Sequence, residues 1–145
     1  MRLGKTLQAV SEVNDSQSIE DLALLGDHLT QQAEMAKRAK ETLTLREQLA
    51  QNLRSATQTT EKRRANLDRL RSGTRPERVP GAIAELEEAQ RYEQYAADQL
   101  TKATTALRED LPFYSRTCAQ EMRRGFREYA MAQLQRERAK LRILG

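Results

Sequence analysis

Glycine and proline are nearly absent from two long stretches of this 145-residue chain. Residues 27–72 contain neither, and residues 82–144 contain only Pro112 and Gly125. Between these stretches, residues 73–81 read Gly-Thr-Arg-Pro-Glu-Arg-Val-Pro-Gly, which is dense in residues that interrupt helices. The layout predicts two very long helices that fold back on each other at one turn. At about 1.5 Å per residue, each helix would span roughly 70–95 Å.

The composition favours an extended helical protein over a compact domain. Hydrophobic residues make up 38% of the chain and aromatic residues 4%, which leaves little material for a broad core. Frequent Ala, Glu, Leu, Arg and Gln are typical of a long helix or coiled coil. We therefore expect an all-α fold, a long antiparallel helical hairpin or coiled coil. Because its core would be thin, the hairpin needs a partner chain to bury its remaining apolar stripe.

The chain offers little material for catalysis or metal binding. One histidine (His28) and one cysteine (Cys118) cannot form an internal disulfide or a multi-ligand metal cluster. No phosphate-binding glycine loop and no zinc or calcium motif occurs. We interpret His28 as a solvent-facing or seam-edge residue and Cys118 as a small hydrophobic residue. The sequence therefore predicts no enzyme, no catalytic residue, no cofactor and no metal. It also lacks an apolar run of the length of a membrane span, which indicates a soluble or peripheral protein.

The predicted elements divide the chain into four segments. Residues 1–13 are interpreted as the end of an earlier helix, and the polar residues 14–18 as an interruption, with Ser18 and Asp21 resembling a capping box. A second helix follows over 18–72, then a tip loop over 73–81 and a third helix over 82–144 with a kink at Pro112. The polar residues Gln32, Arg46, Thr57 and Thr60 fall on the apolar seam of the second helix. They either fix the register of pairing or face solvent where the seam drifts.

Basic residues concentrate at two places. Residues 61–78 hold seven basic and three acidic residues, and residues 115–145 hold eight basic and three acidic. A basic cluster at a tip suits an anionic lipid surface or a nucleic acid, or is an ordinary solvated turn. The tip lacks the interleaved aromatic residues of a single-strand binder, which disfavours nucleic acid. The arginines near the C-terminus, Arg136 among them, alternate with apolar residues. Some of them are interpreted as pairing with acidic residues of a neighbouring helix, in preference to direct contact with lipid.

The order of these segments resembles a BAR domain, most closely that of the sorting nexins. The similarity is strongest over residues 45–134. It rests on the basic run Glu61-Lys62-Arg63-Arg64-Ala65-Asn66-Leu67, the proline-containing tip, the return over 82–95 rich in Glu and Tyr, and the segment Glu121-Met122-Arg123-Arg124-Gly125-Phe126-Arg127-Glu128-Tyr129. Two features depart from the family pattern. The family's phosphoinositide-reading PX domain is absent, and the BAR-like domain over 1–145 is incomplete at its N-terminus.

The resemblance implies a crescent-shaped dimer that senses or generates membrane curvature. It implies a peripheral protein on the cytoplasmic side of endosomal membranes, where it coats tubules in cargo sorting and retrograde transport. The implied partners are an anionic or phosphoinositide-containing membrane, a second sorting-nexin BAR domain in a homo- or heterodimer, and retromer or related machinery. A coiled-coil scaffold or tether without membrane remodelling is the alternative. The implied membrane-binding residues are Lys62, Arg63, Arg64, Arg69, Arg71, Arg75 and Arg78. The implied dimer interface consists of Leu22, Leu25, Leu29, Met122, Phe126, Tyr129 and Leu134.

Overall fold

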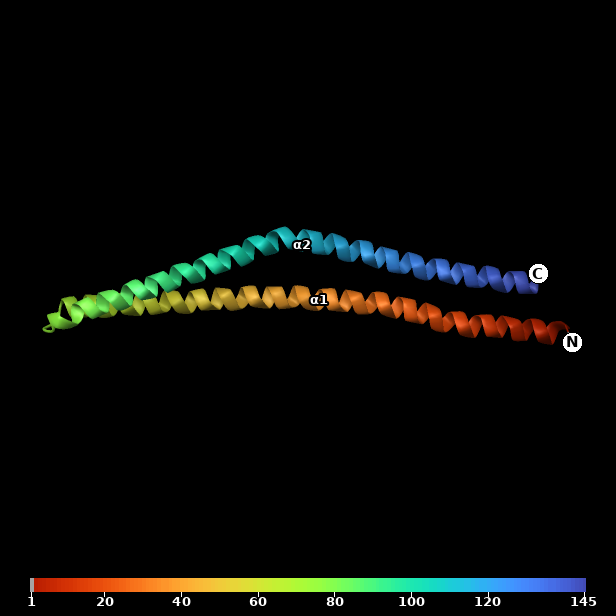
Figure 1. Cartoon of the computed structure of the whole chain (residues 1–145), viewed down its shortest axis with the longest axis horizontal. Helices are drawn as coiled ribbons and strands as arrows, with labels where there is room; N and C mark the ends of the chain where they lie inside the picture. The colour runs from red at the N-terminus through yellow and green to blue at the C-terminus, as the bar shows by residue number, and fades with distance from the viewer. Residues whose placement is uncertain (1) are drawn as a thin grey trace. The chain divides into compact units, whose positions relative to one another are not determined.

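The computed structural model describes residues 2–145, and almost all of them are helical. Helix α1 runs from Arg2 to Arg71, a short 3₁₀ helix η1 from Pro76 to Arg78, and helix α2 from Val79 to Leu144 (Figure 1). No strand occurs among the described residues. Strong helix formers such as Ala, Leu, Glu, Gln, Lys and Arg dominate both long helices, which explains their length. The predicted all-α helical hairpin is confirmed.

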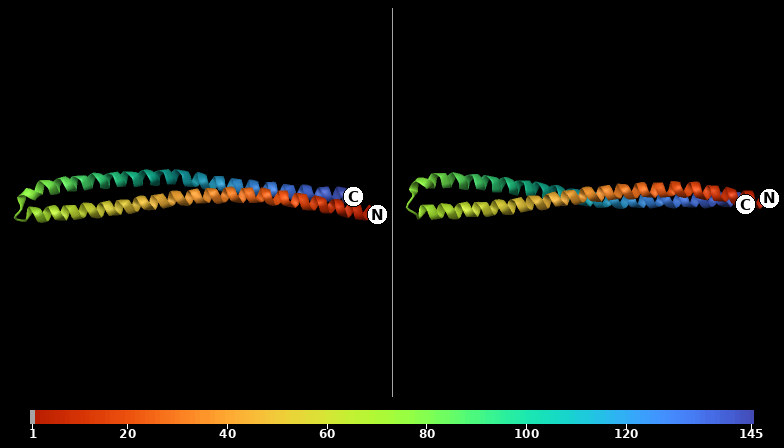
Figure 2. Two further views of the ribbon diagram at one scale, coloured as in Figure 1. Left: turned by 60° about the horizontal axis from the view of Figure 1, so that its bottom comes forward. Right: turned by 90° about the horizontal axis from the view of Figure 1, so that it is seen from below.

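The chain divides into two compact units. The hairpin unit comprises Ala39–Leu111 and contains the turn, and the terminal unit comprises residues 2–38 together with Pro112–Gly145. In each unit a segment of α1 packs antiparallel beside a segment of α2 (Figure 2). The boundary between the units in α2 falls at Pro112, which lies inside that helix.

The predicted interruption at residues 14–18 is wrong, because α1 is continuous through this segment. The Ser16 hydroxyl donates hydrogen bonds to the carbonyl oxygens of Glu12 at 3.0 Å and Val13 at 3.4 Å, so it bonds to its own helix. The segment contains neither Gly nor Pro, and its polar residues each cost only a few tenths of a kcal/mol in a helix. Asp21 is therefore an interior residue of α1 and not part of a helix cap.

The turn is shorter than the predicted loop over 73–81. Helix α1 ends at Arg71, and α2 begins at Val79, three residues before the predicted start. Pro80 lies in the first turn of α2, where a backbone N–H has no partner within the helix and proline is tolerated. Pro80 is therefore part of α2, although the sequence pattern placed it in the loop.

Small side chains form the core of the hairpin unit. Its buried hydrophobic residues are Ala56, Leu67, Ala82, Ala96 and Leu107. Thr60 is buried among them, and its hydroxyl donates to the Ala56 carbonyl oxygen at 3.1 Å. On α2 the buried residues are Ala82, Ala96 and Leu107, and the small alanines let the two helices approach closely.

Polar residues on the seam also join the two helices of this unit. The Arg46 Nε donates to the Thr104 hydroxyl at 3.1 Å, and the Thr57 hydroxyl donates to a Glu93 carboxylate oxygen at 2.8 Å. Of the two interpretations of the polar seam residues, Arg46 and Thr57 fit the first: they bond across the helix pair.

The terminal unit is built differently. All five buried hydrophobic residues of the described chain belong to the hairpin unit, whereas Asp21 and Arg136, both buried, belong to the terminal unit. Many of its large apolar side chains are instead exposed, namely Leu3, Leu7, Ile19, Leu22, Leu29, Phe113, Phe126, Met131, Leu134, Leu141 and Leu144. A helix pair that buries so little apolar surface gains little stability from the hydrophobic effect. This unit is the part of the chain that most needs a covering partner.

Candidate functional site

A cluster of exposed basic side chains surrounds the turn of the hairpin unit. This cluster, which we call the basic tip, consists of Lys62, Arg63, Arg64, Arg69, Arg71, Arg75 and Arg78, and all seven are exposed. Five lie on the last three turns of α1, Arg75 immediately precedes η1, and Arg78 ends it. The residues that the family resemblance implies to be membrane-binding thus lie together around one turn.

Most of the basic tip carries no compensating negative charge. Arg63 pairs with Glu85 of α2 at 2.6 Å, both side chains being about half-exposed. The Arg69 guanidinium donates to the Asn66 side-chain oxygen at 2.8 Å, a neutral partner. Within residues 2–145, no ion pair engages the other five cations. These cations are available to an anionic partner.

The cations on α1 lie on different sides of the helix. Residues seven apart share a side, whereas residues two apart differ by about 200° around the axis. Lys62 and Arg69 therefore lie nearly opposite Arg64. Lys62 and Arg69, together with Ala65 and Asn66, line an open hollow of about 300 Å³ whose wall contains no acidic residue. This hollow is the part of the basic tip best suited to an anionic group.

The predicted interface residues all lie in the terminal unit, but they are not equivalent. Leu22 is 64% exposed and Phe126 55%, and Leu29 and Leu134 are about half-exposed. Leu25, Met122 and Tyr129 are partly buried. The structure leaves most of this set accessible to a second chain.

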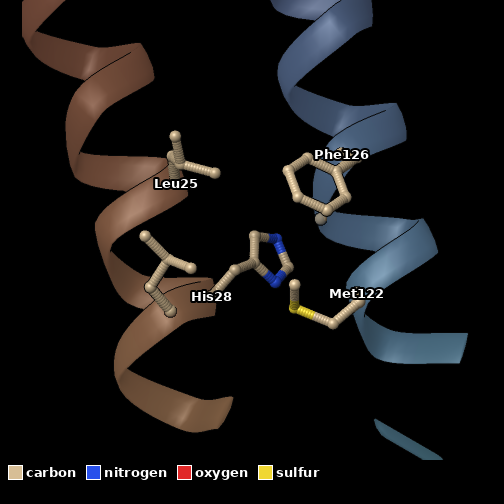
Figure 3. A pocket seen from close by; sticks show the side chains of 6 residues that line it. Leu25, His28, Met122 and Phe126 are labelled. Atoms are coloured by element: carbon tan, nitrogen blue, oxygen red, sulfur yellow. The ribbon is translucent and has the colours of Figure 1, made fainter. Parts of the chain in front are cut away.

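Four of these residues surround one narrow apolar gap. Leu25 and Leu29 of α1 and Met122 and Phe126 of α2 line it together with His28 and Gly125, whereas Leu22, Tyr129 and Leu134 do not (Figure 3). The His28 ring reaches from α1 toward α2, where Met122 and Phe126 lie. Gly125 is buried beside it, and a Cβ at that position would lie 2.8 Å from the His28 Cγ. Glycine thus makes this close approach of the two helices possible.

His28 also joins the helices through a carboxylate. Its Nε2 lies 2.9 Å from one Glu128 oxygen, and the Arg124 Nε donates to the other at 3.0 Å. The hydrogen bond from His28, followed by the one from Arg124, holds the pKa of the Glu128 carboxyl below its ordinary value. His28 is partly buried and lies between α1 and α2, so of the two interpretations from the sequence its position fits the seam-edge residue.

The terminal unit also contains a buried polar network, whose residues are not among the site residues expected from the sequence. Arg136 forms an ion pair with Asp21, and their side chains are only 9% and 8% exposed. The Arg136 guanidinium also donates to the Gln17 backbone carbonyl at 3.0 Å and to the Gln133 side-chain oxygen at 3.3 Å. Gln133 in turn donates to Asp21 at 3.2 Å. The Arg136 Nε and the Gln17 side-chain oxygen are buried without a hydrogen-bond partner among the described residues.

The sequence held one signal for this network. Arg136 is among the arginines interpreted as pairing with an acidic residue of a neighbouring helix, and the structure supplies that residue as Asp21. The partner was missed because Asp21 was assigned to a helix cap. In a continuous α1, Asp21 lies on the side that faces α2.

Two further findings bound the chemistry. Among the described residues, no three His, Cys, Asp or Glu side chains are grouped so that they would hold a metal ion. Neither long helix, over residues 2–145, has a stretch that is long and apolar enough to cross a bilayer.

The two long helices and the turn between them form a helical hairpin of the BAR-like class. The chain belongs to the family described as Vps5 C terminal like, whose model matches residues 1–143. This result confirms the resemblance to the BAR-like domain of sorting nexins, a family of non-enzymatic, membrane-binding proteins.

One relative is the vacuolar protein sorting-associated protein 17 of Schizosaccharomyces pombe (strain 972 / ATCC 24843). It is 29% identical over 145 residues, which cover 99% of this chain and 26% of that protein. The chain thus spans about a quarter of the length of this relative. No solved structure matches the chain significantly.

Proposed function

We propose that this chain is the membrane-binding dimerisation module of an endosomal sorting nexin. In this proposal it forms a crescent-shaped homo- or heterodimer, peripheral on the cytoplasmic side of endosomal membranes, that senses or generates curvature. It coats tubules in cargo sorting and retrograde transport, with retromer or related machinery as a further partner. The observation that carries the proposal is the basic tip, whose cations are mostly unpaired.

The basic tip suits an anionic membrane for an electrostatic reason. Each Lys or Arg near an anionic lipid surface contributes about 1 kcal/mol of binding, and the attraction falls off within a Debye length of about 10 Å at 0.1 M salt. Five cations of the basic tip have no ion pair within the described chain, so their contact with lipid headgroups does not require an internal ion pair to break. Headgroup phosphates of phosphoinositides match the hollow between Lys62 and Arg69 in charge.

Neutralising this hollow tests the proposal. Lys62→Gln with Arg69→Gln is expected to weaken binding to phosphatidylcholine vesicles that contain phosphatidylserine or a phosphoinositide by about thirtyfold, because two cations that contribute about 1 kcal/mol each are lost. Vesicle sedimentation at low and high salt measures the change. The wild-type binding should be sensitive to salt and absent with phosphatidylcholine alone.

A matched pair controls for net charge. Lys102→Gln with Arg108→Gln removes two exposed cations from α2 in the same unit, away from the turn, and should leave vesicle binding within about twofold. Equal losses in both pairs would reject the basic tip as the lipid contact. A wild-type chain that dimerises but does not bind vesicles would support the scaffold alternative. A wild-type chain that binds duplex or single-stranded nucleic acid, with an affinity that falls steeply with salt, would support a nucleic-acid-binding function.

The uncovered apolar residues of the terminal unit support the dimer. Leu22 and Leu29 are seven residues apart on α1, so they share a side, and both are about half-exposed or more. Leu22→Gln with Leu29→Gln is expected to weaken dimerisation at least tenfold, because two apolar side chains would no longer be buried against the partner. Analytical ultracentrifugation across a concentration series measures the dissociation constant.

The hairpin unit offers a matched control for the dimer. Leu43 and Leu45 are about half-exposed there, and Leu43→Gln with Leu45→Gln should affect dimerisation less. If both pairs weaken the dimer equally, or neither does, the terminal unit is not the main interface.

A further inference from the structure

One exposed hydroxyl lies in the segment between the two long helices. Residues 72–75 connect α1 to η1, and Thr74 is exposed there. No hydrogen bond engages its hydroxyl within residues 2–145. Ser72, by contrast, donates its hydroxyl to the carbonyl oxygens of Asp68 at 3.2 Å and Arg69 at 3.1 Å. Of the two hydroxyls, that of Thr74 is free to react.

The residues before Thr74 form a charge pattern. The sequence Arg69-Leu70-Arg71-Ser72-Gly73-Thr74 places one arginine five residues and another three residues before the threonine. Protein kinases select substrates by the pattern of charges near the target residue. Carboxylates in the substrate-binding pocket of a kinase can form bidentate pairs with arginines of the substrate. Both arginines are exposed, and neither forms an ion pair within the described chain. The segment therefore has the charge pattern of a substrate for an arginine-directed kinase.

The local structure can open to such a kinase at low cost. A kinase binds its substrate as an extended segment, so the last turn of α1 over Arg69–Arg71 has to unwind. Leu70 is the one residue of this turn that is partly buried, and helix ends open readily. Gly73 and the exposed Arg75 complete the segment without burying apolar surface.

We propose that Thr74 is a phosphorylation site for an ATP-dependent, arginine-directed protein kinase, and that its phosphate releases the basic tip from anionic membranes. The Thr74 hydroxyl oxygen attacks the γ-phosphorus of ATP, and a new O–P bond forms. The bond from the γ-phosphorus to the bridging oxygen breaks, ADP leaves with that electron pair, and the hydroxyl proton passes to the base of the kinase. The second half of the proposal rests on the proposed function.

The phosphate changes the charge that an anionic surface meets. Residues 61–78 hold seven basic and three acidic residues. A phosphothreonine adds about −1.5 to −2 at neutral pH and offers three strong acceptor oxygens. It thereby removes up to half of the excess positive charge of this segment, and it competes with headgroup phosphates for Arg71, Arg75 and Arg78, its neighbours in sequence. Both effects weaken membrane binding.

The first experiment tests the site on the full 145-residue chain. The chain is incubated with ATP and the catalytic domain of a kinase that selects arginine three and five residues before its target, and the products are mapped by mass spectrometry. One phosphate is expected on Thr74, kept in Ser72→Ala and lost in Thr74→Ala. Arg71→Gln should slow the reaction at least tenfold. A phosphate on Ser72 instead, or none on residues 72–75, overturns the site.

The second experiment tests the consequence. Vesicles of phosphatidylcholine and phosphatidylserine are sedimented with the unmodified and the fully phosphorylated chain, and about tenfold weaker binding of the phosphorylated chain is expected. If both forms bind equally, the switch is wrong while the proposed function stands. If the unmodified chain does not bind, the proposed function fails and the switch fails with it. Mass spectrometry still decides whether Thr74 is the acceptor.

Discussion

Replacing Arg136 with alanine is expected to lower the free energy of unfolding of the terminal unit by about 3–5 kcal/mol, because the change leaves a buried carboxylate without its cation. The side chains of Asp21 and Arg136 are only 8% and 9% exposed, so water does not replace the lost partner. Asp21→Ala should cost a similar amount, since it strands the guanidinium. Hydrogen exchange measured by mass spectrometry should show faster exchange in residues 2–38 and 112–145 than in the hairpin unit.

An apolar pair should recover most of this loss. Asp21→Leu combined with Arg136→Met removes both charges, and replacing a whole buried ion pair by hydrophobic residues is often neutral or stabilising. The guanidinium Nε and the Gln17 side-chain oxygen already lack partners, so the network is incompletely satisfied in the wild type. The double variant should therefore unfold within about 1 kcal/mol of the wild type at equal chain concentration.

The ion pair of Arg63 and Glu85 is the matched control. It joins the same two helices within the hairpin unit, but its side chains are about half-exposed. Arg63→Ala should therefore cost less than about 1 kcal/mol, because solvent screens the pair and hydrates the partner that is left. If Arg136→Ala proves as mild as Arg63→Ala in chemical denaturation, the Asp21–Arg136 pair is not buried in solution.

Local sequence signals were sufficient for the two long helices and for the turn. The scarcity of Gly and Pro, and the cluster of both at residues 73–81, predicted two long helices and the position of the turn between them, but the separate helix expected to end at residue 13 does not occur, because α1 runs through that position. The basic tip followed as well, because cations close in sequence at a turn are necessarily close in space. The predicted interruption of the helix at residues 14–18 is wrong for a physical reason. Polar residues weaken a helix only slightly, and Arg136 of α2 donates to the Gln17 carbonyl oxygen in this segment.

The arrangement of the terminal unit depends on contacts that periodicity does not encode. Leu22, Leu25 and Leu29 are three and four residues apart, as expected for one side of a helix, yet Leu25 is partly buried, whereas Leu22 is 64% exposed and Leu29 about half-exposed. The side of α1 that faces α2 also carries Asp21 and His28, whose partners Gln133 and Glu128 lie 112 and 100 residues further along the chain. An apolar stripe tells which residues need cover, but not whether the same chain or a partner supplies it.

Gly125→Ala is expected to destabilise the terminal unit by about 1–3 kcal/mol, because the new methyl group overpacks the contact with His28. An added Cβ would lie 2.8 Å from Cγ and 3.1 Å from Cβ of His28. The backbone fixes this Cβ, and a rotation about χ1 that moved Cγ away would also take the ring from its bond to Glu128. Without such a contact, alanine in a helix interior would be more stable than glycine by roughly 0.5–1 kcal/mol. Chemical denaturation followed by circular dichroism measures the sign of the change.

Gly26 provides the control within the same unit. It lies inside α1 with no atom within 4 Å of an added Cβ, so Gly26→Ala should stabilise the chain by about 0.5–1 kcal/mol. The two substitutions are chemically identical and should have opposite signs. In a His28→Ala background, Gly125→Ala should lose most of its cost, because the substitution removes the His28 Cγ and Cδ2 and leaves only the Cβ contact at 3.1 Å. If Gly125→Ala stabilises the wild-type chain as Gly26→Ala does, α1 and α2 do not approach closely at this position in solution.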